Sequence, residues 1–233
     1  MRKWNFCAGP AVISEEVLSE VRDELLEWGD SGMSIMEMSH RSKIYDGVAT
    51  EAKQDFIDIL KVPDSHDVLF LQGGATHQFS MVPLNFSEPN SQADYVLSGS
   101  WSKKAISEAS KILEVNTIAS SEDKNFSYIP KGYKIPNDAD YFHITTNNTI
   151  YGTEIKEDIN SDIPLIADMS SDIFSKKVDI KRHNLIYCGA QKNKGPAGVT
   201  LVIVKESALG QVKREIPTIL DYRTHIDKGS MFN

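Results

Sequence analysis

Lys192 is the side chain of this sequence best placed for covalent chemistry. It follows a short apolar run that ends at Cys188, and it lies within the glycine-rich stretch 189–198. A lysine held partly out of water has a lowered pKa, and its neutral amine can form a Schiff base with a carbonyl group. Most lysines are solvated surface residues, so a catalytic role for Lys192 is indicated only if other residues of the sequence complete a site around it.

The segment 72–76 (Gln-Gly-Gly-Ala-Thr) could hold a phosphate group. It follows the apolar run 68–71 and precedes residues with a helical pattern. Glycines let the backbone approach a ligand closely, and a helix N-terminus attracts phosphate, to which Thr76 would add a hydroxyl donor. The alternative is a tight turn with no ligand. The segment is not a P-loop, because no Gly-Lys-Ser/Thr follows.

Trp101 and Asp168 each follow another short apolar run. An indole at the mouth of a sheet could stack on a planar ligand, although a core aromatic is the alternative. A carboxylate that ends an apolar strand needs a partner, such as a protonated ring nitrogen, unless it caps a helix. With Lys192 and the segment 72–76, these residues form the set that a pyridoxal-phosphate site requires: phosphate cup, ring stacker, ring-nitrogen partner and amine.

Two further segments suggest ligand contacts. Arg41, within 39–43 (Ser-His-Arg-Ser-Lys), could bind a carboxylate or phosphate with two parallel hydrogen bonds. The segment 145–149 (Thr-Thr-Asn-Asn-Thr) follows an apolar run and could donate hydrogen bonds to a cofactor. A surface ion pair and a polar turn are the respective alternatives.

The elements that must position these residues follow from hydrophobic spacing. Apolar residues at helical spacing predict one helix from the N-cap Ser14 to about Trp28 and a second over 44–60. Further helices are expected near 75–85 and 103–111. Short apolar runs predict strands at 68–71, 95–97, 115–119, 141–145, 164–167, 185–188 and 199–204. This alternation predicts an α/β fold with a largely parallel sheet, in which ligands bind at the carboxyl ends of the strands. The polar stretch 120–140 reads as a surface excursion between strands.

The bulk properties narrow the class of protein. The 233 residues carry 25 Lys and Arg against 33 Asp and Glu, a net charge of -8, which argues against nucleic acid as a partner. Cys7 and Cys188 form no CxxC pair, so we expect no metal site and a reducing cytoplasm. No apolar segment approaches the length of a membrane span or of a signal core. We therefore expect a cytoplasmic protein with neither a nucleic-acid nor a membrane partner.

From about residue 3 to its end, the sequence resembles the phosphoserine aminotransferase family of class-V pyridoxal-phosphate enzymes. The resemblance rests on six segments that occur in the family's order, among which the His-Arg segment and the Gly-Ser-Trp-Ser-Lys-Lys run are the most specific. They are residues 5–10 (Asn-Phe-Cys-Ala-Gly-Pro), 36–42 (Met-Glu-Met-Ser-His-Arg-Ser), 71–75 (Leu-Gln-Gly-Gly-Ala), 99–105 (Gly-Ser-Trp-Ser-Lys-Lys-Ala), 168–172 (Asp-Met-Ser-Ser-Asp) and 189–193 (Gly-Ala-Gln-Lys-Asn).

The resemblance implies a fold-type I enzyme that acts as a cytoplasmic homodimer. It implies a segment 1–15 near the active site and a large cofactor-binding domain 16–233, built on a mainly parallel, seven-stranded sheet flanked by helices. The implied reaction is reversible amino transfer between glutamate and a phosphorylated 2-keto acid, 3-phosphohydroxypyruvate, which gives O-phosphoserine for serine biosynthesis. Some members of the family also act on 4-phosphohydroxythreonine in vitamin B6 synthesis.

Site residues carry over position by position. Lys192 matches the Schiff-base lysine, Asp168 the partner of the pyridine nitrogen, and Trp101 the residue stacked on the ring. Further cofactor contacts are implied for Ala75, Thr76, Thr149, Gln191 and Asn233. Arg41 matches a contact to the substrate anion, and His40 is expected to assist it.

The sequence departs from the family pattern in three places. Thr76 stands where many relatives have arginine, and Ala8 stands where some have serine. The family motif at 230–233 normally continues with a threonine and prolines, so we expect the small C-terminal domain, with its own His-Arg pair, to be absent from this chain. One rival hypothesis is therefore a fragment that binds pyridoxal phosphate weakly or lacks catalysis. The other is a different pyridoxal-phosphate reaction, such as another aminotransferase or a desulfurase, although no catalytic cysteine loop is evident.

Overall fold

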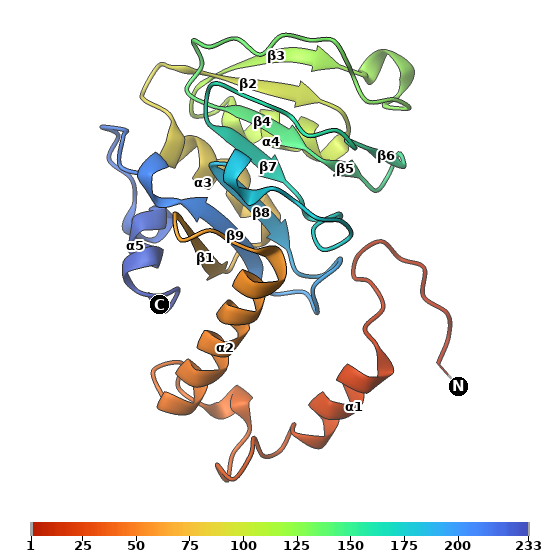
Figure 1. The fold of residues 1–233 in the computed structure, drawn as a ribbon, viewed down its shortest axis with the longest axis vertical. Helices are drawn as coiled ribbons and strands as arrows, with labels where there is room; N and C mark the ends of the chain where they lie inside the picture. The colour runs from red at the N-terminus through yellow and green to blue at the C-terminus, as the bar shows by residue number, and fades with distance from the viewer. Residues whose placement is uncertain (1, 233) are drawn as a thin grey trace.

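The structure is a computed structural model that describes residues 2–232. Asn233, an expected cofactor contact, lies outside the described residues. A seven-stranded sheet forms the body, with helices on both faces, and the N-terminal segment that carries α1 extends away from it (Figure 1). The strands are β1 (His66–Leu71), β2 (Gln92–Leu97), β3 (Glu114–Ser120), β4 (Phe142–Thr145), β7 (Leu165–Asp168), β8 (Leu185–Gly189) and β9 (Thr200–Lys205). The helices are α1 (Glu15–Asp23), α2 (Lys43–Leu60), α3 (Gly74–Phe86), α4 (Ser100–Ala109) and α5 (Tyr222–Asp227).

The strand order is β1-β9-β8-β7-β4-β2-β3, and all neighbours are parallel except where β9 pairs. The expected seven-stranded, mainly parallel α/β sheet is thus confirmed. The direction of β9 was not predicted, because an apolar run reads the same in either direction. The short connection 190–199 suits an antiparallel neighbour, since a parallel crossover needs a longer return path.

The core lies on both faces of the sheet. Every residue of β7 and β8 is buried, as expected for strands covered on both sides. One cluster packs α3, α4 and α5 against the sheet through residues such as Phe79, Tyr187 and Tyr222. The other packs the C-terminal half of α2 against the opposite face through Phe56 and Leu60. Burial of each large side chain stabilises the fold by roughly 1.5–3 kcal/mol.

Two helices differ from their predicted bounds. The helix expected over 14–28 starts at its Ser14 cap but ends at Asp23, and α1 contains no buried residue. A short helix with nothing packed on its apolar side has little to extend it. The helix expected from Lys103 begins earlier, at Ser100, because the Ser102 hydroxyl accepts hydrogen bonds from the backbone N–H groups of Ser98 and Gly99, each at 3.0 Å.

The remaining segments are mostly irregular. A two-stranded hairpin of β5 (Asn147–Asn148) and β6 (Thr153–Glu154), which we did not predict, follows β4. The expected surface excursion 120–140 is anchored to the body at several points: the buried Phe126 ring lies 4.9 Å from that of Tyr151, and Tyr133 packs on the core near Phe142. Short 3-10 turns occur at Ile35–Glu37, Glu122–Lys124, Ile180–Arg182, Glu206–Ala208 and Thr218–Leu220. Among the residues described, no helix combines the length and apolar character that a bilayer crossing requires.

Candidate active site

The sheet topology gathers the four predicted groups at one edge. Asp168 is the last residue of β7, and Lys192 lies in the turn after β8. Trp101 lies in the first turn of α4, which follows β2, and Ala75 in the first turn of α3, which follows β1. The parallel strands β2, β7 and β8 point the same way, so their carboxyl ends, and the segments that follow them, meet at this edge.

Asp168 is a buried carboxylate that uses only one of its oxygens within the chain. Its Oδ1 accepts hydrogen bonds from the backbone N–H of Ser170 at 3.0 Å and from the Ser170 hydroxyl at 2.6 Å. Burial raises the pKa of Asp168, and Ser170 and Lys192 act against that rise. None of the hydrogen bonds found among residues 2–232 uses Oδ2 of Asp168. That oxygen is therefore available to a donor from outside the chain, and a cationic donor would favour the charged carboxylate most.

Lys192 is a half-buried amine beside an indole. Its Nζ lies 5.5 Å from the centroid of the Trp101 ring. Burial lowers the pKa of Lys192, while the carboxylates of Asp168 and Asp172 act in the opposite direction. A lowered pKa increases the fraction of neutral amine, which is the nucleophilic form.

Trp101 presents a ring that the chain leaves partly uncovered. The indole packs against the core cluster that α3 and α4 form on the sheet, as Ala75 also does. Its Nε1 is buried and has no hydrogen-bond partner among residues 2–232. The ammonium of Lys104 lies 4.6 Å from the ring centroid. An unpaired buried donor is costly, which is consistent with a ligand that completes this wall of the site.

The N-terminus of α3 is open to an anion. Gly73 and Gly74 precede Ala75 with φ angles of +87° and +69°, a left-handed backbone that favours glycine. The N-cap position, Gly73, has no side chain to accept hydrogen bonds, so the first N–H groups of the helix, including those of Ala75 and the exposed Thr76, keep their capacity. These donors and the helix dipole suit a phosphate.

Thr149 and Gln191 lie at the border of this edge. Thr149 is half-buried in the turn after β5, next to Asn148, whose amide reaches the Ser98 hydroxyl at 3.4 Å. The Gln191 carbonyl accepts a hydrogen bond of 2.8 Å from the backbone N–H of Ala11, which brings the N-terminal segment to the Lys192 turn. Each residue is close enough in the fold to contribute, but neither makes a side-chain contact to Lys192 or Asp168 among the described hydrogen bonds.

Arg41 and His40 are not brought into contact with Lys192. Arg41 is exposed, and within residues 2–232 no hydrogen bond or ion pair uses its guanidinium group. The Nε2 atom of His40 is buried without a partner. His40 lines a cavity of about 1110 Å³ between α2 and the sheet, together with Gln72 and Lys194. That large cavity contains neither Asp168 nor Lys192, so its size alone is a poor guide to where chemistry occurs.

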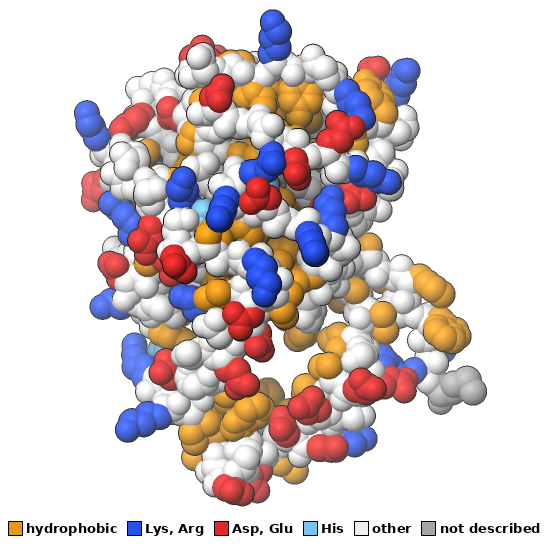
Figure 2. Space-filling model, viewed as in Figure 1, with side chains coloured by type: hydrophobic (Ala, Val, Ile, Leu, Met, Phe, Trp, Pro, Cys, Tyr) orange, Lys and Arg blue, Asp and Glu red, His pale blue; other side chains and the backbone are white. Residues whose placement is uncertain are grey.

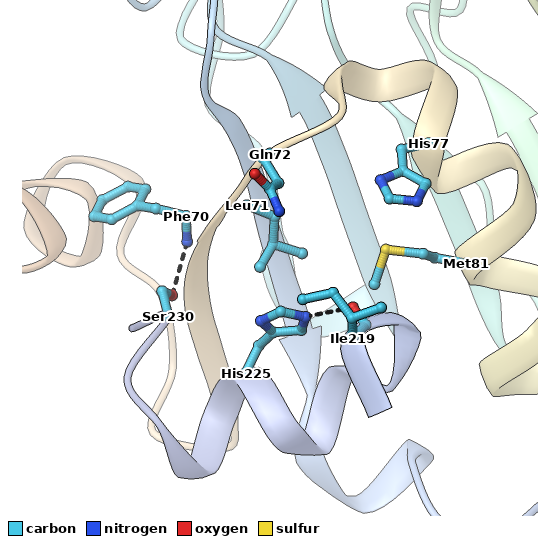
Figure 3. Close-up of a pocket in the computed structure, with 8 residues that line it drawn as sticks. All are labelled: Phe70, Leu71, Gln72, His77, Met81, Ile219, His225 and Ser230. Atoms are coloured by element: carbon cyan, nitrogen blue, oxygen red, sulfur yellow. Dashed lines mark hydrogen bonds between the residues drawn. The ribbon is translucent and has the colours of Figure 1, made fainter. Parts of the chain in front are cut away.

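A smaller cavity of about 160 Å³ lies beside the start of α3, between α3 and α5 (Figure 3). Gln72, His77 and Met81 contribute to its wall. His225 also lines it, but the Nε2 of that ring is already hydrogen-bonded to the Ile219 carbonyl at 2.8 Å. This cavity lacks the amine, the carboxylate and the indole, and we assign it no role in the chemistry.

Two residues near Asp168 escaped the sequence analysis. The Thr146 hydroxyl donates to the Asp172 carboxylate at 2.6 Å, and the same oxygen lies 3.0 Å from the Asp168 carbonyl. This contact ties the segment after β4 to the segment after β7. Segment 145–149 was singled out for its polar side chains and segment 168–172 for the carboxylate at a strand end, but neither feature predicts that the two segments pair. No group of three or more His, Cys, Asp or Glu within the described part of the chain could hold a metal ion.

Comparison with known proteins places this arrangement in context. The family model described as aminotransferase class-V matches residues 3–224. The curated phosphoserine aminotransferase of Bacteroides thetaiotaomicron is 54% identical over 233 residues, which are 100% of this chain and 65% of that protein. The curated phosphoserine aminotransferase of Listeria innocua is 51% identical over 234 residues, 100% of this chain and 64% of the relative.

Solved structures agree with the curated proteins. A phosphoserine aminotransferase from Bacillus circulans subsp. alkalophilus matches with a TM-score of 0.95 and 43% identity, over 100% of this chain and 65% of that one. A phosphoserine aminotransferase with bound pyridoxal phosphate, from Trichomonas vaginalis, matches with a TM-score of 0.94 and 36% identity, over 100% of this chain and 70% of that one. The chain thus spans about 65% of the length of curated relatives such as these.

Proposed function

This chain belongs to the class-V aminotransferase family, and we propose that it is the part of a phosphoserine aminotransferase that binds pyridoxal phosphate. The observation that carries the proposal is the meeting of a half-buried amine, a buried carboxylate and an indole at one sheet edge, beside the uncapped start of α3. The similarity to curated phosphoserine aminotransferases supports it, as does the bound cofactor of the Trichomonas vaginalis relative.

The residues present fit each chemical feature of this cofactor. The first N–H groups of α3 suit the phosphate, and the Trp101 indole suits the face of the ring. The free Oδ2 of Asp168 suits a protonated pyridine nitrogen, since a cationic donor there would offset the burial of the carboxylate. Lys192 supplies the amine that an aldehyde requires. Two buried polar atoms without partners, Trp101 Nε1 and Thr145 Oγ1, also suit a polar ligand at this edge.

In the proposed mechanism, pyridoxal phosphate, when bound, supplies an aldehyde that reacts with amines and a ring that accepts electrons from the substrate α-carbon. Lys192 would hold the cofactor through Nζ, and when free, the same Nζ would act as the base that accepts the proton of the substrate α-carbon and then releases it. Asp168, whose Oδ1 is held by Ser170, would keep the ring nitrogen protonated. Trp101 would fix the plane of the ring.

The proposed substrates are glutamate as amino donor and a phosphorylated 2-keto acid, 3-phosphohydroxypyruvate, as acceptor. The reverse reaction uses O-phosphoserine and 2-oxoglutarate. The roles of Arg41 and His40 as anion contacts rest on the family resemblance, because no hydrogen bond or ion pair among residues 2–232 joins their side chains to Lys192. The related substrate 4-phosphohydroxythreonine would place the same chemistry in vitamin B6 synthesis.

We propose further that the protein works as a cytoplasmic homodimer. The N-terminal forty residues carry large apolar side chains that the chain leaves open, including Trp4 and Phe6 at 90% and 91% exposure. Figure 2 shows apolar side chains gathered along this extended region. Exposed apolar surface of this kind marks interaction sites. Sedimentation of the purified protein would give a dimer mass, and a monomer at all accessible concentrations would contradict this part of the proposal.

A second candidate function is cofactor binding without completed amino transfer. The exposed position of Arg41, with no contact to the other site residues, favours it. A direct assay separates the two. The chain is incubated with pyridoxal phosphate, glutamate and 3-phosphohydroxypyruvate, and O-phosphoserine is measured by chromatography, with unphosphorylated pyruvate as the control acceptor. Lysine-dependent formation of O-phosphoserine supports the aminotransferase, whereas cofactor binding without product supports the second candidate.

A further inference from the structure

The N-terminal segment touches the body of the protein at the turn that carries Lys192. The backbone N–H of Ala11 donates to the Gln191 carbonyl at 2.8 Å. Gly9, two residues earlier, lies directly against the lysine stem: a Cβ atom at Gly9 would stand 2.8 Å from Lys192 Cγ and 3.5 Å from Lys192 Cε. We call residues 9–11 the strap.

This contact is a specific one, because the rest of the N-terminal arm (residues 2–33) packs little against the body. Within the described residues, the Ala11–Gln191 bond is the one hydrogen bond that joins residues 2–33 to the rest of the protein. The helix α1 has no buried residue, and Trp4 and Phe6 are almost fully exposed. The arm is therefore open nearly everywhere along its length and close to the body at the lysine.

Only glycine fits the strap at this point. Side-chain carbons in proteins essentially never approach within 3.0 Å of another carbon, so a methyl group at Gly9 would displace either the lysine stem or the strap. The stem has several rotatable bonds, and a wall along it reduces the rotamers available to the amine. The Trp101 ring, 5.5 Å from Nζ, bounds the amine at its other end.

We propose that Gly9 is a positioning residue for Lys192, and that the strap limits the access of water to its stem. The burial that lowers the pKa of Lys192 is then due in part to the strap. The consequence for catalysis rests on the proposed function. The contact itself belongs to the cofactor-free chain and can be tested there.

The first test measures the amine without cofactor. A small acylating reagent labels the protein across a pH series, and peptide mass spectrometry gives the pH midpoint for Lys192 beside those of exposed lysines. In Gly9→Ala, displacement of stem or strap lets water reach the amine, so the midpoint should rise towards that of the exposed lysines. The matched control is Gly47→Ala on α2, where an added Cβ meets no atom within 4 Å. Equal midpoints in Gly9→Ala and the unmodified chain would overturn the proposal.

A second variant reaches the strap by another route. Ala11→Pro removes the N–H that bonds to Gln191 and leaves Gly9 unchanged. It should move the midpoint in the same direction. If the labelling midpoint of Lys192 shifts in Gly9→Ala but not in Ala11→Pro, the Gly9 contact alone, and not the hydrogen bond of Ala11, positions the lysine. A downward shift in both would contradict the strap as a cover for the amine.

The final test is a double-mutant cycle on cofactor binding. Gly9→Ala should weaken lysine-dependent binding of pyridoxal phosphate by roughly ten- to a hundredfold, because small displacements of a reacting group are costly. Added to Lys192→Ala, which has no Cγ contact to lose, it should change the remaining affinity little. An equal loss in both backgrounds would contradict the positioning role. If the unmodified chain shows no lysine-dependent binding, the proposed function fails, and the labelling midpoints still decide the role of Gly9.

Discussion

The N-terminal arm (residues 2–33) and the sheet body both contain apolar residues in regular patterns. These residues are buried in the strands of the body and left uncovered in the helix of the arm. In the body, every residue of β7 and β8 is buried, and the apolar runs that predicted these strands lie between two layers of helices. In the arm, an equally regular apolar pattern gives α1, which has no buried residue and ends five residues before Trp28. An apolar pattern indicates that a face will be covered. It does not indicate that the cover lies within the described chain.

We expect the largest difference between the two regions in the free energy of unfolding when one leucine in each is replaced by alanine. Leu185 in β8 is fully buried, whereas Leu26, beyond α1, is 86% exposed. Leu185→Ala should lower the free energy of unfolding by about 2–5 kcal/mol, because it removes apolar contacts and leaves a cavity. Leu26→Ala should change it by less than about 0.5 kcal/mol. Urea unfolding of the two variants at one protein concentration measures both values. A large loss in Leu26→Ala would mean that the arm is already packed in solution.

The body should also carry most of the acid sensitivity. His143 is buried, stacks on Tyr95 at 4.6 Å and contacts the Tyr187 hydroxyl through Nε2 at 2.9 Å. Burial lowers the pKa of His143 to about 3, from 6.5. The unfolded chain therefore takes up a proton that the folded chain refuses, and stability falls as the pH drops from about 6.5 towards 3, by an amount on the order of a few kcal/mol.

Urea unfolding at pH 7 and pH 5 measures this effect. In His143→Phe, the loss of stability between the two pH values should be smaller, even though the Tyr187 contact is gone and the variant is less stable overall. An unchanged difference between pH 7 and pH 5 in His143→Phe would assign the acid sensitivity to other groups.

We expect Asp168, at the sheet edge, to lower the stability of the cofactor-free chain while it strengthens binding of pyridoxal phosphate. In the cofactor-free chain, burial raises the pKa of Asp168, so the charged carboxylate is a liability that grows as the pH rises through its folded pKa. Asp168→Asn keeps the acceptor for Ser170 and removes the charge. It should raise the melting temperature of the cofactor-free chain at neutral pH and weaken pyridoxal-phosphate binding by about ten- to a hundredfold. A variant that lost both stability and affinity would identify Asp168 as a structural residue.

The smallest effects compare two similar helix caps. The Ser42 hydroxyl accepts from the Tyr45 N–H at 3.2 Å at the start of α2, and the Ser14 hydroxyl accepts from the Val17 N–H at 3.3 Å at the start of α1. Ser42→Ala should cost about 1 kcal/mol of global stability, because α2 packs on the sheet. Ser14→Ala should cost almost nothing globally and only fray α1, a difference that hydrogen exchange and urea unfolding together detect. Equal global losses would place α1 within the cooperative fold.

Local patterns predicted most of the body. The sheet class, the bounds of α2 and the strand ends that carry Asp168 and Lys192 all follow from apolar runs, caps and the stop before Pro63. The direction of β9 and the pairing of Thr146 with Asp172 were not predicted, because both depend on neighbours that are distant in the sequence. The site roles of the predicted residues stay predictions, and for Arg41 the structure adds no supporting contact.

The most direct test of the account is the absorbance spectrum of the purified chain with added pyridoxal phosphate. Lys192→Ala is compared with Lys104→Ala, because the Lys104 amine lies 4.6 Å from the Trp101 ring centre and the Lys192 amine lies 5.5 Å from it. We expect a cofactor band that Lys104→Ala keeps, that Lys192→Ala loses, and that shifts when glutamate is added to the unmodified chain. A band that survives in Lys192→Ala, or no band in the unmodified chain, would contradict the assignment of this edge as the cofactor site.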